Sequence, residues 1–301
     1  MPGPPVAVLT DSTASLPPEV AHAHRITVVP LHVAVGGRET LDGAAGGAQV
    51  ATEMRSGSRV TTSQPSVAEL VAGMTEALGP DGAELVCLHL SGELSGTVEV
   101  SRQAAEDVMA ARPGCRVQVV DTRTVAGGTG LAALAAAEAA QHGRSSDAVA
   151  AVAREVAAKS LVLFAVPDLQ HLLRGGRLRA ATSVMGTALG IRPVLGIADG
   201  RVTVVEAVRG TARARRRMVA RAVRWAGGPG AQVPHPPGER VRLAVHHFDA
   251  AEAAETLQDQ LTAEVAETGA VVTEVVRSEV TAVVGAHAGP GVLAVVVAPV
   301  P

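Results

Sequence analysis

The chain has almost no aromatic side chains, and this scarcity already excludes several classes of protein. Its 301 residues include no tyrosine, one tryptophan and two phenylalanines. Stacking platforms for single-stranded nucleic acid are therefore nearly absent, and a net charge of -3 gives no basic field that would attract a polyanion. No apolar run approaches the roughly 20 residues of a membrane span, and no signal pattern opens the chain. We expect a cytoplasmic protein with no nucleic-acid partner and no integral membrane association.

Cysteine and the usual catalytic motifs are equally scarce. Cys87 and Cys115 both lie in apolar, strand-like runs, which predicts free thiols rather than a disulfide or a metal site. His246 and His247 lack a third ligand at metal-binding spacing, so we expect no metal and no other cofactor. The sequence contains no P-loop, no complete dinucleotide fingerprint and no G-x-S-x-G elbow. No Ser-His-Asp arrangement can be recognised, and no pair of carboxylates stands out as an acid/base couple.

Small apolar residues are what the chain has in abundance. Apolar residues make up 47% of the sequence, so the core has to be built from alanine, valine and leucine. The length suits two domains or one large one. Up to about residue 160, short apolar runs alternate with helical patterns, which predicts a mostly parallel, doubly wound sheet. The strands expected in this region are 6–10, 26–35, 85–90 and 116–121, and the expected helices are 17–24, 48–55, 66–78, 97–111, 131–141 and 146–159. A strand over 161–166 opens the region that follows.

The pattern changes beyond residue 160. The runs 191–197 and 201–208 flank Asp199-Gly200, a strong hairpin signal, so we expect antiparallel pairing in an α+β region. Further strands are expected over 240–248, 271–276 and 292–297, and helices over 180–189, 213–224 and 250–267. The segment 227–238, with four prolines and four glycines, predicts a loop.

Polar clusters follow several of the predicted strands. Asp11-Ser12-Thr13 ends the first one, and in open α/β sheets the carboxyl ends of strands hold the site residues. The hydroxyls of Thr61 to Ser63 stand just before a helix that Ser66 caps with Glu69, and Ser91 to Thr97 repeats this arrangement. A helix start flanked by hydroxyls is a natural anion site, although ordinary capping and turn chemistry explains these hydroxyls equally well.

Two further donors stand beside glycine-rich turns. His287 precedes Gly289-Pro290-Gly291, a turn that would deliver the imidazole to the rim of a site, unless the histidine is only structural or solvated. Arg177 follows the glycine pair Gly175-Gly176. Together with the hydroxyls of Thr62 and Ser95, these donors could converge on an anion, of which a carboxylate is the simplest.

The helix expected over Arg213–Arg224 carries six arginines. It is interpreted either as a solvated face or as a docking surface for an acidic partner. A nucleic-acid-binding role is the least favoured, because no aromatic residues and no recognition fold accompany the arginines.

The order and spacing of these motifs resemble those of one known family. The motifs are Asp11-Ser12-Thr13, Thr62-Ser63-Gln64-Pro65-Ser66, Leu94-Ser95-Gly96-Thr97, Leu173-Arg174-Gly175-Gly176-Arg177-Leu178, Arg192-Pro193-Val194-Leu195 and His287-Ala288-Gly289-Pro290-Gly291. From end to end the chain is similar to the DegV family of fatty-acid-binding proteins. The resemblance implies a three-layer α/β/α domain over residues 1–160 and a two-layer α+β domain with a mixed sheet over residues 161–301.

The resemblance also implies a function and a site. A long acyl chain would lie between the two domains, with its carboxylate on Thr62 and Ser95 and with Gly96, Arg177 and His287 near the head group. The protein would be a carrier rather than an enzyme. It would present the fatty acid to a separate fatty-acid kinase, which forms the acyl-phosphate used in phospholipid metabolism. The arginine-rich helix, or alternatively Arg174 and Arg179, would dock to this kinase.

A second hypothesis remains open. The fold also resembles the substrate-binding part of dihydroxyacetone kinases, in which a histidine holds a small keto-sugar. His287 or His89 could fill that role here and make the protein an enzyme subunit. The mass of the bound ligand separates the two hypotheses, because one requires a long-chain acid and the other a triose.

Overall fold

The first part of the chain forms a parallel four-stranded sheet in the computed structural model, which describes residues 6–43, 46–178, 190–227 and 240–301. Its strand order is β2-β1-β6-β7, and all three pairings are parallel. The strands are β1 (Ala7–Asp11), β2 (Ile26–Val29), β6 (Glu84–His89) and β7 (Arg116–Asp121). The predicted doubly wound sheet is confirmed.

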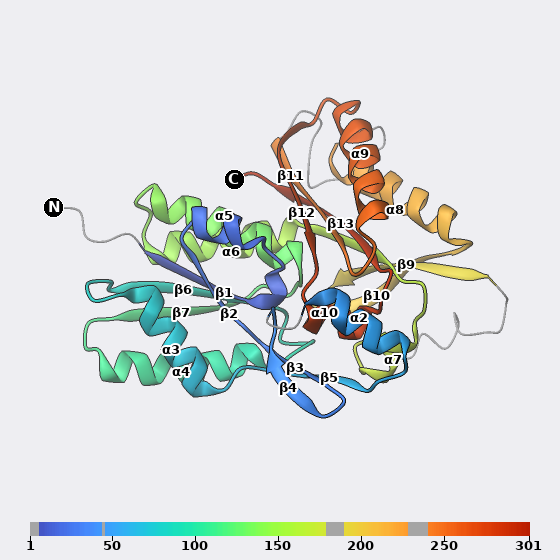
Figure 1. The fold of residues 1–301 in the computed structure, drawn as a ribbon. Helices are drawn as coiled ribbons and strands as arrows, with labels where there is room; N and C mark the ends of the chain where they lie inside the picture. The colour runs from blue at the N-terminus through green and yellow to red at the C-terminus, as the bar shows by residue number, and fades with distance from the viewer. Residues whose placement is uncertain (1–5, 44–45, 179–189, 228–239) are drawn as a thin grey trace.

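Helices cover both faces of this sheet, as three layers in Figure 1. On one face lie α3 (Val67–Leu78) and α4 (Thr97–Ala111), whose apolar side chains share a core with β1, β6 and β7. On the other face lie α1 (Pro18–Ala23), α5 (Gly127–Gln141) and α6 (Ser146–Lys159). The predicted cap of α3 is confirmed: Ser66 and Glu69 form a capping box. Ser15 ends the short 3-10 helix η1 (Ser12–Ala14), and Pro17 precedes α1 without a side-chain capping bond.

A small antiparallel sheet, in the order β4-β3-β5, departs from the prediction. One strand was expected over 26–35, but Pro30 divides it into β2 and β3 (His32–Val35), which belong to different sheets. Gly36 and Gly37, both with positive φ, turn the chain back into β4 (Arg38–Leu41), a strand that was not predicted. The hydroxyl-rich segment before α3 is itself a strand, β5 (Val60–Ser63), and α2 spans Gly47–Arg55.

The second part of the chain forms a six-stranded mixed sheet in the order β10-β9-β8-β13-β11-β12. Only β11 and β12 pair in parallel; the other pairings are antiparallel, including the predicted hairpin of β9 and β10. Helices α8 (Thr211–Trp225) and α9 (Ala251–Ala266) pack on one face. The strands are β8 (Leu161–Ala165), β9 (Ile191–Ala198), β10 (Arg201–Arg209), β11 (Arg240–His247), β12 (Val271–Glu279) and β13 (Leu293–Pro299). The two-domain α/β fold is thus confirmed, while the division at residues 160/161 remains our proposal.

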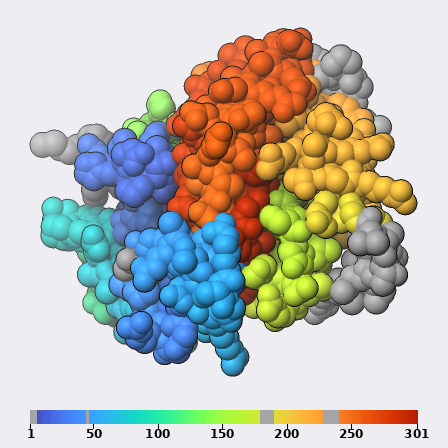
Figure 2. Space-filling model, turned by 45° about the vertical axis from the view of Figure 1, so that its right-hand side comes forward, coloured from blue at the N-terminus to red at the C-terminus, as the bar shows by residue number. Residues whose placement is uncertain are grey.

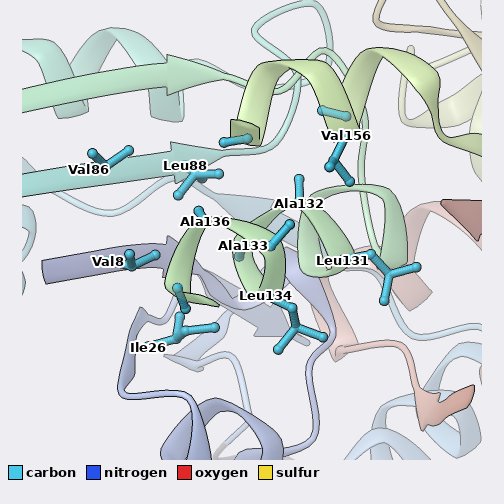
Figure 3. Close-up of a cluster of buried hydrophobic side chains, with 14 of the residues drawn as sticks. Val8, Ile26, Val86, Leu88, Leu131, Ala132, Ala133, Leu134, Ala136 and Val156 are labelled. Carbon is cyan, nitrogen blue, oxygen red and sulfur yellow. The ribbon is translucent and has the colours of Figure 1, made fainter. Parts of the chain in front are cut away.

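Helix α5 connects the two sheets. Its alanines and leucines pack on Val8 and Leu88 of the parallel sheet (Figure 3), and the same core includes Ala244 and Val296 of the mixed sheet. The helix begins at Gly127, four residues before the predicted start. A Cβ on Gly127 would lie 2.4 Å from His246 Nε2, so the glycines here permit the close packing that the sequence suggested.

Several predictions fall outside the described residues, namely Arg179, the helix expected over 180–189, and the loop over 227–238 apart from Gly227. Within the described parts of the chain, no helix combines the length and apolar character that crossing a membrane requires.

Candidate ligand-binding site

An apolar cavity of about 420 Å³ lies between the mixed sheet and the carboxyl ends of the parallel strands. Phe164, Ile197 and Ala294 line it from β8, β9 and β13, and Leu90 and Val125 line it from the segments after β6 and β7. Its volume falls in the range of small-molecule sites, about 300–1,000 Å³. The other lining residues are Thr13, Leu31, Thr62, Ser63, Gln64, Leu94, Ser95, Gly96, Ala126, Val162, Leu172, Arg177, Val202, His246, Val280, Val283, Val284, His287, Ala288 and Val292.

The arginine-rich helix α8 lies across the mixed sheet from this cavity. Successive side chains of a strand point to opposite faces. Phe164 faces the cavity, whereas its neighbour Leu163 shares a core with Met218 of α8. On α8, Arg217 and Arg221 both pair with Glu206 of β10. This arrangement places the helix away from any ligand in the cavity.

Thr62 and His287 form the centre of the polar group in the cavity wall. Thr62 Oγ1 lies 2.8 Å from His287 Nε2. Thr62 comes from β5, whereas His287 lies in the last turn of α10 (Ala282–Ala288). The turn Gly289–Gly291 was expected to carry His287 to a rim at a strand edge. That expectation is wrong in one respect: α10 carries the histidine, and the turn only follows it.

Arg177 lies against the same imidazole. Its Nε donates to Leu94 O at 3.2 Å and its Nη1 to Gly175 O at 2.5 Å. A Cβ on Gly175 would lie 2.4 Å from His287 Nδ1, so the backbone of α7 (Gln170–Arg174) and its C-cap reaches the ring. Burial, and secondly the positive charge of Arg177, lower the pKa of His287 to about 4. The imidazole is therefore neutral near pH 7, and its single N–H can donate a hydrogen bond to a carboxylate.

Ser95 and Gly96 lie in the loop before α4. Ser95 Oγ lies 2.9 Å from Thr97 Oγ1, and Gly96 is the N-cap of α4, with a backbone so close to Gln64 that a Cβ would lie 2.4 Å from its Oε1. The structure thus brings all five predicted site residues, Thr62, Ser95, Gly96, Arg177 and His287, to the wall of one cavity. Their role as fatty-acid ligands remains a proposal.

The structure also shows a polar chain that the sequence did not reveal. Asp11 Oδ2 lies 2.9 Å from His89 Nδ1, and His89 Nε2 lies 2.8 Å from Ser101 Oγ. This is the order of a catalytic triad, but all three side chains are fully buried. Asp11 also accepts from Leu90 N and Thr13 N. This hydrogen-bonded group of side chains therefore holds the two segments of the cavity wall that contain Thr13 and Leu90 in place, and it does not contact a substrate.

The two cysteines and the possible metal ligands can also be placed in the structure. Cys87 is buried and Cys115 half-buried, and both are free thiols. Burial raises the pKa of each. Among the described residues, no three histidine, cysteine or carboxylate side chains gather in a way that could hold a metal.

Comparison with known proteins identifies similar chains over nearly the whole length. The model of the DegV family, described as an uncharacterised protein family, matches residues 5–300. A DegV domain-containing protein of Streptomyces coelicolor is 38% identical over 294 residues, which cover 97% of this chain and 98% of that one.

Two solved structures resemble this one closely. One is a DegV family protein of Thermus thermophilus, described for its fatty acid binding, with a TM-score of 0.85 and 32% identity over 98% of this chain and 99% of that one. The other is DegV of Bacillus subtilis, a fatty acid binding protein, with a TM-score of 0.84 and 28% identity over 99% of this chain and 100% of that one.

Proposed function

The chain belongs to the DegV family, and on that basis we propose that it binds a long-chain fatty acid and presents the carboxylate to a fatty-acid kinase. The observation that carries the proposal is the composition of the cavity wall. Valine, leucine and other apolar side chains form most of it, while Thr62 and His287 form a hydrogen-bonded pair with Arg177 and Ser95 in the same wall. An amphiphile with a single acidic end matches this wall.

The magnitudes indicate which part of the ligand dominates binding. Burying a methylene contributes roughly 0.8 kcal/mol, so about 14 of them contribute on the order of 11 kcal/mol before the costs of binding. Two or three charge-assisted hydrogen bonds contribute roughly 1.5–3 kcal/mol each. The hydrocarbon tail therefore supplies most of the affinity, and the polar group determines which end of the ligand faces the kinase.

Truncation of Ser95 separates these two roles. We expect Ser95→Ala to bind palmitate within about tenfold of the wild type, because it deletes one hydrogen bond and leaves the tail contacts intact. Phosphorylation of the bound lipid by a fatty-acid kinase with ATP should fall much further, since the carboxylate is no longer held in position. Calorimetry with palmitate and a product assay measure the two effects.

A matched hydroxyl deletion far from the cavity is Thr256→Ala on α9, whose Oγ1 donates only to Glu252 O. This control should change neither quantity. Complete loss of palmitate binding by a folded Ser95→Ala protein would contradict the division of roles.

The keto-sugar hypothesis gains no support from the site. His89 is fully buried between Asp11 and Ser101 and cannot reach a ligand. His287 is accessible to the cavity, but the wall around it is mostly apolar, whereas a triose requires polar partners for each of its oxygens. A titration with dihydroxyacetone should therefore give no binding.

The kinase-facing surface is also part of the proposal. Helix α8 lies across the sheet from the cavity. We therefore place the docking surface near Arg174, at the end of α7 beside the glycine that faces His287, rather than on Arg213–Arg224. Charge reversal at Arg215 and Arg216 should leave lipid phosphorylation unchanged. A large loss of phosphorylation with that variant would place the kinase on α8 instead.

A further inference from the structure

A second cavity, of about 520 Å³, adjoins the polar group of the first one. Thr62, Arg177 and His287 line both cavities, so these three residues separate an apolar space from a polar one. Three segments form the second cavity: the end of α2 with the start of β5, helix α7 with its C-cap, and the last turn of α10. In Figure 2 they correspond to the light-blue, yellow-green and red segments that meet on the visible face.

The charge of this second cavity is of one sign. Arg59, Arg174 and Arg177 line it, and the described part of its wall contains no carboxylate. We call it the arginine cavity. The nearby carboxylate of Glu53 is occupied by Ser58, whose Oγ donates to it at 2.6 Å.

The arginines retain free hydrogen-bonding capacity. Within the described ranges, Arg174 donates to Gln170 O at 3.4 Å, and Arg177 donates to two backbone carbonyls. Among the described residues, neither these two nor Arg59 forms an ion pair with a carboxylate. Burial, followed by the charge of Arg174, lowers the pKa of His171 in the same wall. An anion placed here would supply the negative charge that these groups lack.

We propose that the arginine cavity is a phosphate site, which receives the phosphorylated head group of a lipid whose hydrocarbon chain lies in the apolar cavity. The proposal rests on the proposed function, since it requires the tail to occupy that cavity. On the side of the apolar cavity, Thr62, Ser95 and His287 already provide enough hydrogen-bonding groups for a single carboxylate. A doubly charged group with three terminal oxygens instead suits several guanidinium forks, and the shared wall lets one molecule span both cavities.

Hexadecyl phosphate is a suitable probe, because its ester bond survives the measurement. We expect Arg59→Gln combined with Arg174→Gln to weaken hexadecyl phosphate binding at least about tenfold, since two charge-assisted contacts are lost. Palmitate binding should change less than about twofold, because neither arginine lines the apolar cavity. The pair Arg144→Gln with Arg154→Gln, both exposed on the surface, is the matched control for net charge and should change neither affinity.

Each outcome decides a separate point. If hexadecyl phosphate binds the double variant as tightly as the wild type, the phosphate site is refuted while the proposed function stands. If inorganic phosphate alone binds with equal affinity and shows the same loss, the site takes free phosphate and the lipid assignment is refuted. If neither palmitate nor hexadecyl phosphate binds the wild type, the proposed function itself fails.

Discussion

The imidazole of His287 is fixed from two directions. Its Nε2 meets the hydroxyl of Thr62, and its Nδ1 faces the backbone at Gly175. The sequence predicted the histidine, the hydroxyl and the neighbouring arginine, because each belongs to a recognisable motif. It could not predict the contact with Gly175, because nothing in a glycine pair shows what packs against it across more than one hundred residues.

Gly175→Ala tests this contact. The residue has a φ of -73°, which alanine adopts readily, so the main conflict is the new Cβ at 2.4 Å from His287 Nδ1, while the backbone oxygen of His171 lies 3.2 Å away. We expect the ring to move away from Thr62 and palmitate affinity to fall about tenfold. Calorimetry and the NMR shifts of the imidazole measure the two effects.

Gly46→Ala is the matched control, since Gly46 has a φ of -57° and no neighbour within 4 Å of its Cβ position. It should behave as the wild type. Unchanged imidazole shifts in Gly175→Ala would show that the ring is not held there.

His246 couples stability to pH. Burial lowers its pKa to about 4, below the ordinary value of 6.5. The unfolded chain therefore binds a proton as the pH falls below about 6.5, while the folded protein does not. The stabilisation is present above pH 6.5 and is lost progressively toward pH 4. Between pH 7 and 5, the free energy of unfolding should fall by about 2 kcal/mol on account of this residue.

Urea unfolding of wild type and His246→Asn at both pH values isolates this contribution, because the other histidines contribute equally to both proteins. Over this interval the free energy of unfolding of the variant should fall by about 2 kcal/mol less than that of the wild type. For His22→Asn, at an exposed position, the free energy of unfolding should fall by as much as for the wild type. Equal losses in all three proteins would show that His246 titrates normally in the fold.

At the scale of elements, α10 is the helix that the sequence concealed. Its seven residues Ala282–Ala288 contain valines and a glycine, which favour other conformations, and its N-cap Thr281 makes no side-chain capping bond. The cap comes from another part of the chain: Asp42 Oδ1 accepts from Val283 N at 3.2 Å, while Asp42 Oδ2 accepts from Ser12 Oγ at 2.6 Å. A helix held by a partner more than two hundred residues away has no local signal.

Asp42→Ala should therefore loosen the element that carries His287. It leaves two donors, Val283 N and the Ser12 O–H, without their acceptor, at a cost of about 1–3 kcal/mol each, although Ser12 Oγ still accepts from Leu31 N. We expect the free energy of unfolding to fall by about 2 kcal/mol or more, and palmitate affinity to fall with it. Denaturant unfolding and calorimetry provide the measurements. Asp81→Ala, at an exposed turn position, should stay within about 0.5 kcal/mol of the wild type, and an equally small effect of Asp42→Ala would contradict this role.

Other elements could be predicted because their signals are local. Asp199-Gly200 specified the β9–β10 hairpin, and the serine–glutamate capping box specified the start of α3. In the small sheet β4-β3-β5, Gly36-Gly37 is also a local hairpin signal for β3 and β4. The pairing of β3 with β5 joins segments that are remote in the sequence, so it could not be predicted in the same way.

At the scale of the whole molecule, the ligand cavity is a consequence of the shared core. Helix α5 packs on both sheets, so it sets how far the mixed sheet stands from the carboxyl ends of the parallel strands. The sequence predicted that polar residues would gather at those ends, because parallel strands place them there. The size of the apolar space depends on the packing of both domains together, which periodicity alone cannot give.

The most direct test of the account is a crystal structure with ω-bromopalmitate, in which the anomalous signal of bromine marks the end of the chain. The account predicts a bromine peak inside the apolar cavity, among residues such as Phe164 and Ala294, and a carboxylate within hydrogen-bonding distance of Thr62 or Ser95. A bromine peak on the surface, or a carboxylate remote from His287, would contradict it.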